Sequence, residues 1–212
     1  MTGTRRGRPR TPLLSRESIV AATLQVIDAE GTAAVGMRSV ARALGVDAKS
    51  LYNHVDGKDG LLDAVTEHLL GGLVLPAPTG DARRDLRAIA DSFRDQALKH
   101  PQAAPLVLTR QLASPQALAP VNAVLAVLRD AGAGTEEAVH MLRMLLATLI
   151  GTLLREVSAA PAFGSNDRED TLTASGLPAL VDAAAHLARF DREAEYEYTV
   201  DLAITAVLHR LG

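Results

Sequence analysis

The chain has 212 residues, enough for one large or two small domains, and its hydrophobic content of 48% excludes a disordered chain. Aromatic residues make up only 3% and Trp is absent, while Ala and Leu are abundant, so the composition favours helices over strands and predicts an all-α protein. The absence of Cys excludes disulfides and thiolate metal sites, and the formal net charge is −3.

Charge is divided unevenly along the chain. Residues 1–58 hold 9 Lys or Arg against 5 Asp or Glu, a net of +4, whereas residues 59–212 hold 13 against 20, a net of −7. DNA would attract the first part and repel the second, so this asymmetry predicts a nucleic-acid partner for the N-terminal end.

Residues 1–14 contain arginines and no acidic residue. Gly7 and Pro9 oppose helix formation, so we expect a flexible basic arm. Arg8 and Arg10 resemble the arginines of short Gly-Arg-Pro arms that lie in the narrow minor groove of A·T-rich DNA. A solvated tail that adds only nonspecific attraction to phosphates is the alternative.

Two short helices at a sharp angle are predicted for residues 36–58, and a helix from Ser15 to about Glu30 covers their back. Apolar residues recur at the spacing of a one-sided helix, Gly45 follows where a left-handed residue ends a helix, and Asp47 can cap the next one. The pattern is typical of a helix-turn-helix. The residues expected to be buried in this pair are Met37, Val40, Ala41, Leu44, Leu51 and Val55.

The open side of the second helix carries groups that bond to DNA. A cation, a hydroxyl, a phenol, an amide and an imidazole suit phosphates and base edges, and the major groove admits a helix that carries them. Lys49, Asn53 and Arg38 are the candidates for base edges, because Asn pairs with adenine and Arg or Lys with guanine. Phosphate contacts are assigned mainly to Ser50, Tyr52, His54 and Lys58.

This segment resembles the DNA-binding part of TetR-family (tetracycline-repressor-type) transcriptional regulators. Leu51-Tyr52-Asn53-His54-Val55, with Lys58 behind it, is a more specific match than a bare helix-turn-helix pattern. A helical hairpin that only packs is the alternative interpretation. The further matching residues are Arg38, Ala41, Leu44, Gly45, Val46 and the run Leu61-Leu62-Asp63-Ala64.

The run PAPTG at residues 76–80 breaks the chain. It separates a predicted DNA-binding domain, residues 15–75, from a second domain, residues 81–212. Before the break, Asp56 is expected to cap a helix that starts at Lys58 and links both parts mechanically.

The second domain is expected to consist of helices, one of which is nearly all apolar. Val139 to Leu154 contains His140 and Arg143, and its 16 residues are fewer than the about 20 that a membrane span needs. We therefore expect no membrane partner and a helix buried on several sides. The expected helices are about Asp81–Lys99, Ala103–Leu112, Ser114–Gly132, Thr135–Ser158, Pro178–Arg189 and Asp191–Arg210, with a mobile loop at residues 161–175.

Residues 81–212 resemble, more loosely, the C-terminal domain of the tetracycline-repressor branch of the family. The resemblance implies a homodimer that joins residues 135–158 and 191–210 of two subunits in a four-helix bundle, and a small-molecule pocket in each subunit. The apolar surface of these helices favours the same conclusion, although a thick monomeric core is the alternative. The matching residues are Ser92-Phe93-Arg94, Thr109-Arg110, Gly132 and Gly176-Leu177-Pro178.

The positions that bind tetracycline and magnesium in that branch fall near Val74, Ile89, Val107 and Val124, all apolar here. Tetracycline–magnesium is therefore not the expected ligand, because the ion needs oxygen or imidazole donors. We expect a more apolar effector, although each lining residue alone could be ordinary core. The expected lining residues are Phe93, Val107, Val124, Met141, Leu145 and Thr148.

No metal site, cofactor site or catalytic motif is expected. The histidines form no pair at ligand spacing with a carboxylate, and nothing resembles a nucleophile elbow, a phosphate loop or a metallohydrolase helix.

The sequence thus predicts a homodimeric, ligand-responsive transcriptional regulator, a repressor, that binds a near-palindromic operator in double-stranded DNA. We expect it in the cytoplasm, because no export signal opens the chain and Cys is absent. One alternative is a DNA-binding factor without a small-molecule effector. Another is a helical enzyme with a helix-turn-helix, which would need a polar cluster in its pocket.

Overall fold

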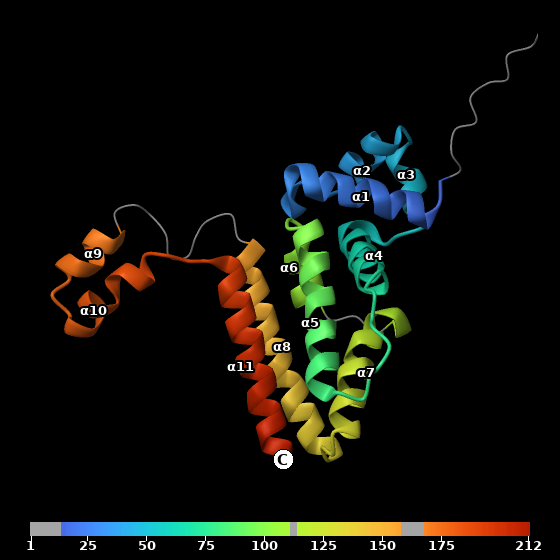
Figure 1. The fold of residues 1–212 in the computed structure, drawn as a ribbon. Helices are drawn as coiled ribbons and strands as arrows, with labels where there is room; N and C mark the ends of the chain where they lie inside the picture. The colour runs from blue at the N-terminus through green and yellow to red at the C-terminus, as the bar shows by residue number, and fades with distance from the viewer. Residues whose placement is uncertain (1–13, 111–113, 158–167) are drawn as a thin grey trace, which may run out of the picture. The chain divides into compact units, whose positions relative to one another are not determined.

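The computed structural model describes residues 14–110, 114–157 and 168–212 (Figure 1). Within these residues the regular elements are helices without any strand, which confirms the predicted all-α class. A 3-10 turn, Thr32–Ala34, joins the first two helices. The α-helices are α1 (Arg16–Glu30), α2 (Met37–Leu44), α3 (Ala48–Leu51), α4 (Gly57–Gly71), α5 (Ala82–Lys99), α6 (Ala104–Thr109), α7 (Pro115–Asp130), α8 (Thr135–Val157), α9 (Arg168–Ala174), α10 (Pro178–Leu187) and α11 (Arg192–Leu211).

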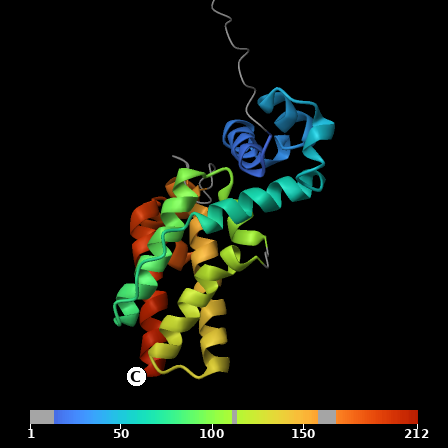
Figure 2. The ribbon, with the colours of Figure 1, turned by 90° about the vertical axis from the view of Figure 1, so that its right-hand side faces the viewer.

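The chain forms two compact units that meet inside α4, between Val65 and Thr66. In the first unit, α1 packs on α2 and α2 packs on α3, as Figure 2 shows. The division falls within a continuous helix, so the first part of α4 belongs to one unit and its end to the other. The predicted break at residues 76–80 lies after α4, inside the second unit.

Most predicted helix starts are confirmed, because they depend on hydrogen bonds between near neighbours in the sequence. In several helices a side-chain oxygen at the N-cap accepts a hydrogen bond from a backbone N–H of the first turn, which has no partner within the helix. These caps are Ser15 on Ser18 N, Asp81 on Arg84 N, Ser114 on Ala117 N, and Asp191 on Glu193 N and Ala194 N.

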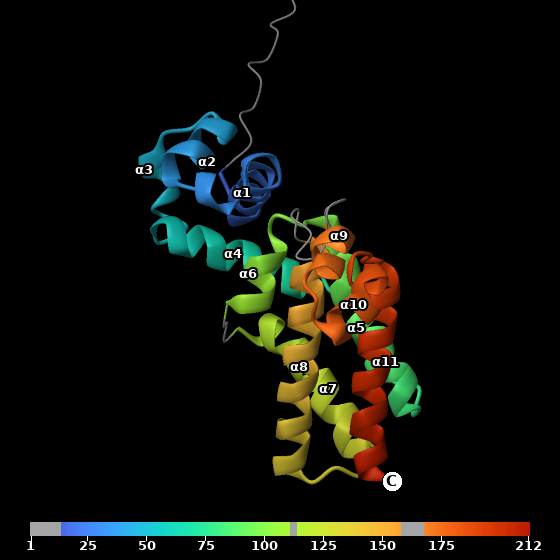
Figure 3. The ribbon, with the colours of Figure 1, turned by 90° about the vertical axis from the view of Figure 1, so that its left-hand side faces the viewer.

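The core of the second unit lies between α5, α7, α8 and α11. α8 packs along α11 and α7, and α5 contacts all three of these helices. Figures 1 and 3 show α8 and α11 side by side along most of their length. Leu128 of α7, Leu153 of α8 and Tyr196 of α11 are completely buried where these helices meet.

The prediction of a mobile loop at residues 161–175 is wrong for its second part. Residues 161–167 lie outside the described chain, but Arg168–Ala174 forms α9, which packs on α10 (Figure 3). Glu169 and Asp170 lie in the first turn, where negative charge stabilises a helix. None of the α9 residues is buried, so this helix has no buried face whose spacing could have predicted it.

α8 spans 23 residues and is long and apolar enough, by length and composition alone, to cross a membrane. The expectation that its apolar stretch is too short for a span is therefore wrong. Core helices of helical bundles meet the same criteria, and α8 packs against α5, α6, α7 and α11. This packing covers part of its apolar surface. Its Glu137 and Glu156 form ion pairs with Arg210 and Arg94.

The segment between α4 and α5 is attached to α5 by one buried carboxylate. Asp85, 5% exposed, accepts hydrogen bonds from the backbone N–H and hydroxyl of Thr79, at 3.0 and 2.7 Å, and from Gly80 N at 3.3 Å. The Thr79 hydroxyl, opposed by burial and helped by the two backbone N–H groups, lowers the pKa of Asp85 below its ordinary value of 3.8.

Replacement of Asp85 by Asn is expected to lower the free energy of unfolding at neutral pH, because one carboxylate oxygen becomes an NH₂ group that faces N–H donors. A carboxyl whose pKa is lowered in the folded state adds to the free energy of unfolding. This addition is complete above the ordinary pKa and disappears as the pH falls through the folded-state pKa. The wild-type advantage over D85N should therefore be constant above about pH 5 and shrink below about pH 4. Urea unfolding of both proteins from pH 3 to 7 measures this, and a pH-independent difference would contradict it.

Candidate nucleic-acid interface and ligand cavity

The pair α2–α3 is shaped by its capping residues. Gly45 ends α2 in the left-handed conformation, at φ +67°, which glycine adopts without strain. Asp47 then accepts a hydrogen bond from Lys49 N at 2.7 Å and starts α3. Leu51 is fully buried and Val55 is 7% exposed, so the apolar side of this segment faces the first unit's core as predicted.

The second helix is shorter than the sequence indicates. α3 ends at Leu51, and residues 52–54 form a turn. His54 N and Val55 N both donate to the Leu51 carbonyl, at 2.9 and 3.1 Å, so the backbone tightens after one helical turn. The recognition segment, defined as residues 48–54, therefore combines one helical turn with a turn of tighter backbone.

The predicted DNA-binding side chains lie on the surface of the first unit. In the recognition segment all are exposed except the half-buried Ser50, and Tyr52 has 58% of its surface exposed. Lys58, at the start of α4, donates from Nζ to the Ala33 carbonyl at 3.3 Å but remains exposed. Arg8 and Arg10 lie outside the described residues. The exposed set is Arg38, Lys49, Tyr52, Asn53, His54 and Lys58.

The positive excess of residues 1–58 comes from the arginines before residue 14. From residue 14 to residue 58, basic and acidic residues are balanced at 5 each. The described surface would therefore attract DNA through individual exposed cations such as Lys49 and Arg38, and not through a net positive charge.

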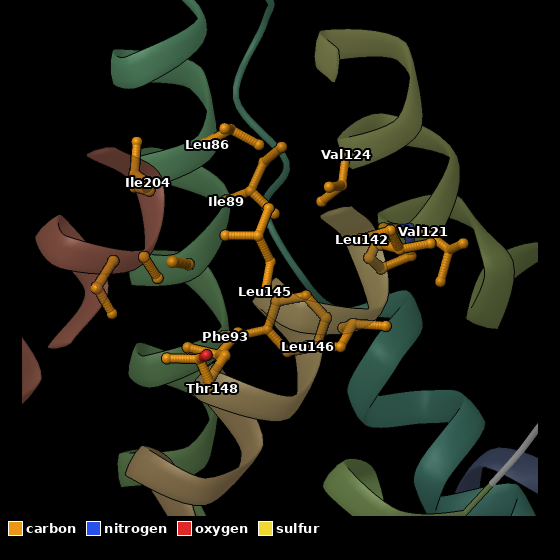
Figure 4. A pocket seen from close by; sticks show the side chains of 15 residues that line it. Leu86, Ile89, Phe93, Val121, Val124, Leu142, Leu145, Leu146, Thr148 and Ile204 are labelled. Atoms are coloured by element: carbon orange, nitrogen blue, oxygen red, sulfur yellow. The ribbon is translucent and has the colours of Figure 1, made fainter. Parts of the chain in front are cut away.

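An apolar cavity lies in the second unit, between α5, α7, α8 and α11 (Figure 4). Four of the predicted ligand residues line it: Phe93, Val124, Leu145 and Thr148. The other lining residues are Leu86, Ile89, Ala90, Pro120, Val121, Leu142, Leu146, Leu149, Val200, Ala203 and Ile204.

Two predicted ligand residues are not among those that line this cavity. Val107 is half-buried on the short helix α6. Met141, 5% exposed, instead contributes to a groove of about 700 Å³ on the α8–α11 surface. Adjacent residues of a helix point about 100° apart, so Met141 leaves the cavity wall while Leu142 belongs to it.

The lining residues that were not predicted could have been found in the sequence only by their helical spacing. Leu86, Ile89 and Phe93 follow at intervals of three and four along α5, as do Leu142, Leu145 and Leu149 along α8. This spacing identifies a buried face, but it does not distinguish a wall around an empty space from ordinary core.

The cavity is small and nearly devoid of polar groups. Its volume is about 60 Å³, whereas pockets for drug-sized ligands have about 300–1,000 Å³. A larger ligand would therefore have to displace side chains or helices. Thr148 is the only polar side chain among the described residues that line the cavity.

A buried polar cluster ties α5, α8 and α11 together. Arg94 donates from Nε and Nη2 to Glu156, at 3.0 and 2.7 Å, and Glu156 is only 4% exposed. The guanidinium of Arg94 lies 4.5 Å from the ring centroid of Tyr196, whose hydroxyl donates to Asp91 at 2.8 Å. On the same side of α5, Arg87 donates to Asp91 at 2.9 Å and pairs with Glu197.

The ionisation of this cluster follows from burial and pairing. Burial raises the pKa of Tyr196, and the hydrogen bond to Asp91 raises it further, so the phenol stays protonated. The hydrogen bond to Glu156 raises the pKa of Arg94. Arg94 therefore stays charged and the Tyr196 phenol stays neutral. Within the described part of the chain, no group of three His, Asp or Glu side chains could hold a metal ion.

Comparison with known proteins matches both units. The model of bacterial regulatory proteins of the tetR family matches residues 19–65, and that of the tetracyclin repressor-like C-terminal domain matches residues 75–208. An HTH-type transcriptional regulator of Saccharopolyspora erythraea is 34% identical over 212 residues, covering 93% of this chain and 88% of that protein.

Two further relatives are similar along most of the chain. The tetracycline repressor protein class E of Escherichia coli is 28% identical over 189 residues, covering 87% of this chain and 86% of the repressor. The crystal structure of the Streptomyces coelicolor protein ActR in complex with actinorhodin has a TM-score of 0.82 at 25% identity, covering 94% of this chain and 97% of ActR.

Proposed function

The chain belongs to the TetR family of bacterial transcriptional regulators and is not an enzyme, and from this premise we propose that it is a homodimeric repressor released from its operator by a largely apolar small molecule. The observation that carries the proposal is the cavity inside the tetracyclin repressor-like domain, whose walls are apolar except for one hydroxyl. The proposal includes a cytoplasmic location, where the chromosome is accessible.

The relatives support a small-molecule effector, and the cavity supports its apolar character. One relative is a tetracycline repressor and another was crystallised with actinorhodin. Ile89 and Val124, which fall near positions that contact tetracycline and magnesium in the tetracycline-repressor branch, offer no ligand atom to a cation. A polar drug would leave its groups unpaired against these walls, which costs free energy, whereas an apolar molecule loses nothing there.

The proposed route from cavity to DNA passes through α7 and α4. α7 supplies Val121 and Val124 to the cavity, and its first turn lies against the end of α4, where a Cβ on Gly71 would be 3.6 Å from Gln116 Cβ. A ligand larger than the cavity would move α7, and with it the helix that continues into the DNA-binding unit. The ligand would then favour a dimer geometry that does not fit the operator.

The second subunit is proposed to cover the exposed faces of α8 and α11. Met144 of α8 is 37% exposed, and Tyr198 and Leu202 of α11 are 70% and 55% exposed. On the same face, Ala147 is exposed, and a Cβ on Gly151 would meet no atom within 4 Å. An apolar face of this kind, used twice, forms a closed dimer interface.

Replacement of Ala147 by Arg is expected to convert the dimer into a monomer, because the new charge would have to be buried in the interface. Ala119 is exposed on α7, so A119R is the matched control and should remain dimeric. Sedimentation velocity measures the outcome. A dimer that survives A147R unchanged would exclude this face as the interface.

Selection of bound duplexes from a random pool tests the DNA-binding part of the proposal. The dimer should enrich an inverted repeat whose half-sites lie about 34–36 Å apart, or a multiple of this, so that two recognition segments enter major grooves on one side of the duplex. Affinity should also fall steeply with salt concentration. Binding without sequence preference, even at low salt, would contradict the proposal.

A DNA-binding factor without an effector is the second candidate, and the small volume of the cavity favours it. In that case side chains fill the pocket, and no apolar compound weakens operator binding. A gel-shift screen with the selected operator distinguishes the two candidates. If a compound that binds in the cavity releases the protein from the operator, the candidate without an effector is excluded.

A further inference from the structure

The one polar group in the cavity wall is poorly satisfied. The Thr148 hydroxyl donates to the sulfur of Met144, one turn earlier on α8, over 3.6 Å. A thioether is a weak acceptor, so the hydroxyl loses little when it turns to another partner. It can donate to a carbonyl or accept from a hydroxyl of a bound molecule.

The position of Thr148 gives the cavity a polar end and an apolar end. In Figure 4, Thr148 lies beside Phe93 at one end of the labelled side chains, and Leu86 lies toward the other. Phe93 and Leu86 are seven residues apart on α5, which corresponds to about 10 Å along the helix axis. All described wall residues between these ends are apolar.

We propose that Thr148 determines the specificity of the cavity by selecting an elongated apolar molecule that carries a hydroxyl or carbonyl group at one end only. This inference rests on the proposed function, because it assumes that the cavity is the effector site. A molecule with no polar group leaves the Thr148 hydroxyl on its weak sulfur acceptor. A molecule with a second polar group at the far end buries that group among side chains such as Leu86 and Val124 without a partner.

The ligand class can be tested on the full-length dimer with three probes of one shape. Naphthalene has no polar group, 2-naphthol has one hydroxyl at one end, and 2,6-dihydroxynaphthalene has one at each end. Isothermal titration calorimetry gives Kd for each probe with the wild type, T148V and T152V. Thr152 lies one turn further along α8 and does not line the cavity, so T152V is the matched loss of a threonine hydroxyl.

The measured quantity is the ratio of the naphthol affinity to the naphthalene affinity, which cancels the contribution of the shared ring system. This ratio should fall by about three- to tenfold in T148V, as for the loss of one neutral hydrogen bond, and stay unchanged in T152V. The dihydroxy probe should bind the wild type more weakly than 2-naphthol.

Two failures are distinguishable. Equal ratios in the wild type, T148V and T152V, or tighter binding of the dihydroxy probe, would overturn the role of Thr148 but leave the cavity as a ligand site. If no probe binds saturably, or if binding survives V124W, which fills the cavity with an indole, the effector site itself is refuted and the inference with it.

Discussion

Replacement of Asn53 by Ala is expected to reduce affinity for the selected operator at least about 30-fold, without a change in the stability of the protein. Asn53 is exposed in the recognition segment and is a candidate to pair with adenine. A bidentate contact to a base discriminates by about 1–3 kcal/mol, and a dimer makes the contact in both half-sites. The loss should be confined to the specific site, so that affinity for random duplex changes little.

Asn122 provides the matched control for this substitution, because it is exposed on α7 in the second unit. N122A should bind the operator like the wild type. K58A provides a contrast, since a phosphate contact is assigned to Lys58: it should weaken binding to operator and random DNA alike and lower the salt slope by about one per subunit. Fluorescence anisotropy over a salt series measures all three variants. Wild-type operator affinity in N53A would exclude Asn53 from base recognition.

Replacement of Arg94 by Met is expected to lower the free energy of unfolding by about 3–5 kcal/mol, the largest stability effect that the structure indicates. The substitution removes the bidentate partner of Glu156, which is 4% exposed, and the cation that lies over the Tyr196 ring. Glu156 joins α8 to α5 through this pair, so the loss should destabilise the second unit.

Arg83 provides the matched control, because it also pairs from α5 with a carboxylate on another helix, Asp201 of α11, but at the surface. Arg83 and Asp201 have side-chain exposures of 46% and 64%, so R83M should cost less than about 1 kcal/mol. Replacement of both members of the buried pair, in R94M/E156L, should restore much of the stability, because no charge is left unpaired. Urea unfolding at one protein concentration measures the series. If R94M cost no more than R83M, the pair would not stabilise the fold.

The elements that sequence reasoning predicted well are those whose causes lie within a few residues. Ser15, Asp81, Ser114 and Asp191 cap helices through bonds to residues two or three positions away. Gly45 ends α2 for an equally local reason. The predictions that failed or shifted depend on more distant packing. α9 has no buried residue of its own, and α3 is cut short where Val55 turns toward the core.

The cavity shows the same limit. Phe93, Val124, Leu145 and Thr148 line it as expected, but nothing in their spacing along α5, α7 and α8 separates them from core residues. Met141 has the apolar character of a wall residue but lines the groove on the α8–α11 surface instead. A difference of one position, about 100° of helix rotation, decides between cavity and outer groove, and the sequence does not specify this rotation to such accuracy.

The sequence by itself determined the helical class, most helix starts and the composition of the recognition segment, because period-3.6 apolar spacing and capping bonds act between near neighbours. Tertiary structure alone decided which faces meet. Arg94 finds Glu156 62 positions away, and Tyr196 finds Asp91 105 positions away. Whether a space remains between α5, α7, α8 and α11 depends on how side chains from four separate helices fill one volume, a property that no single helix carries.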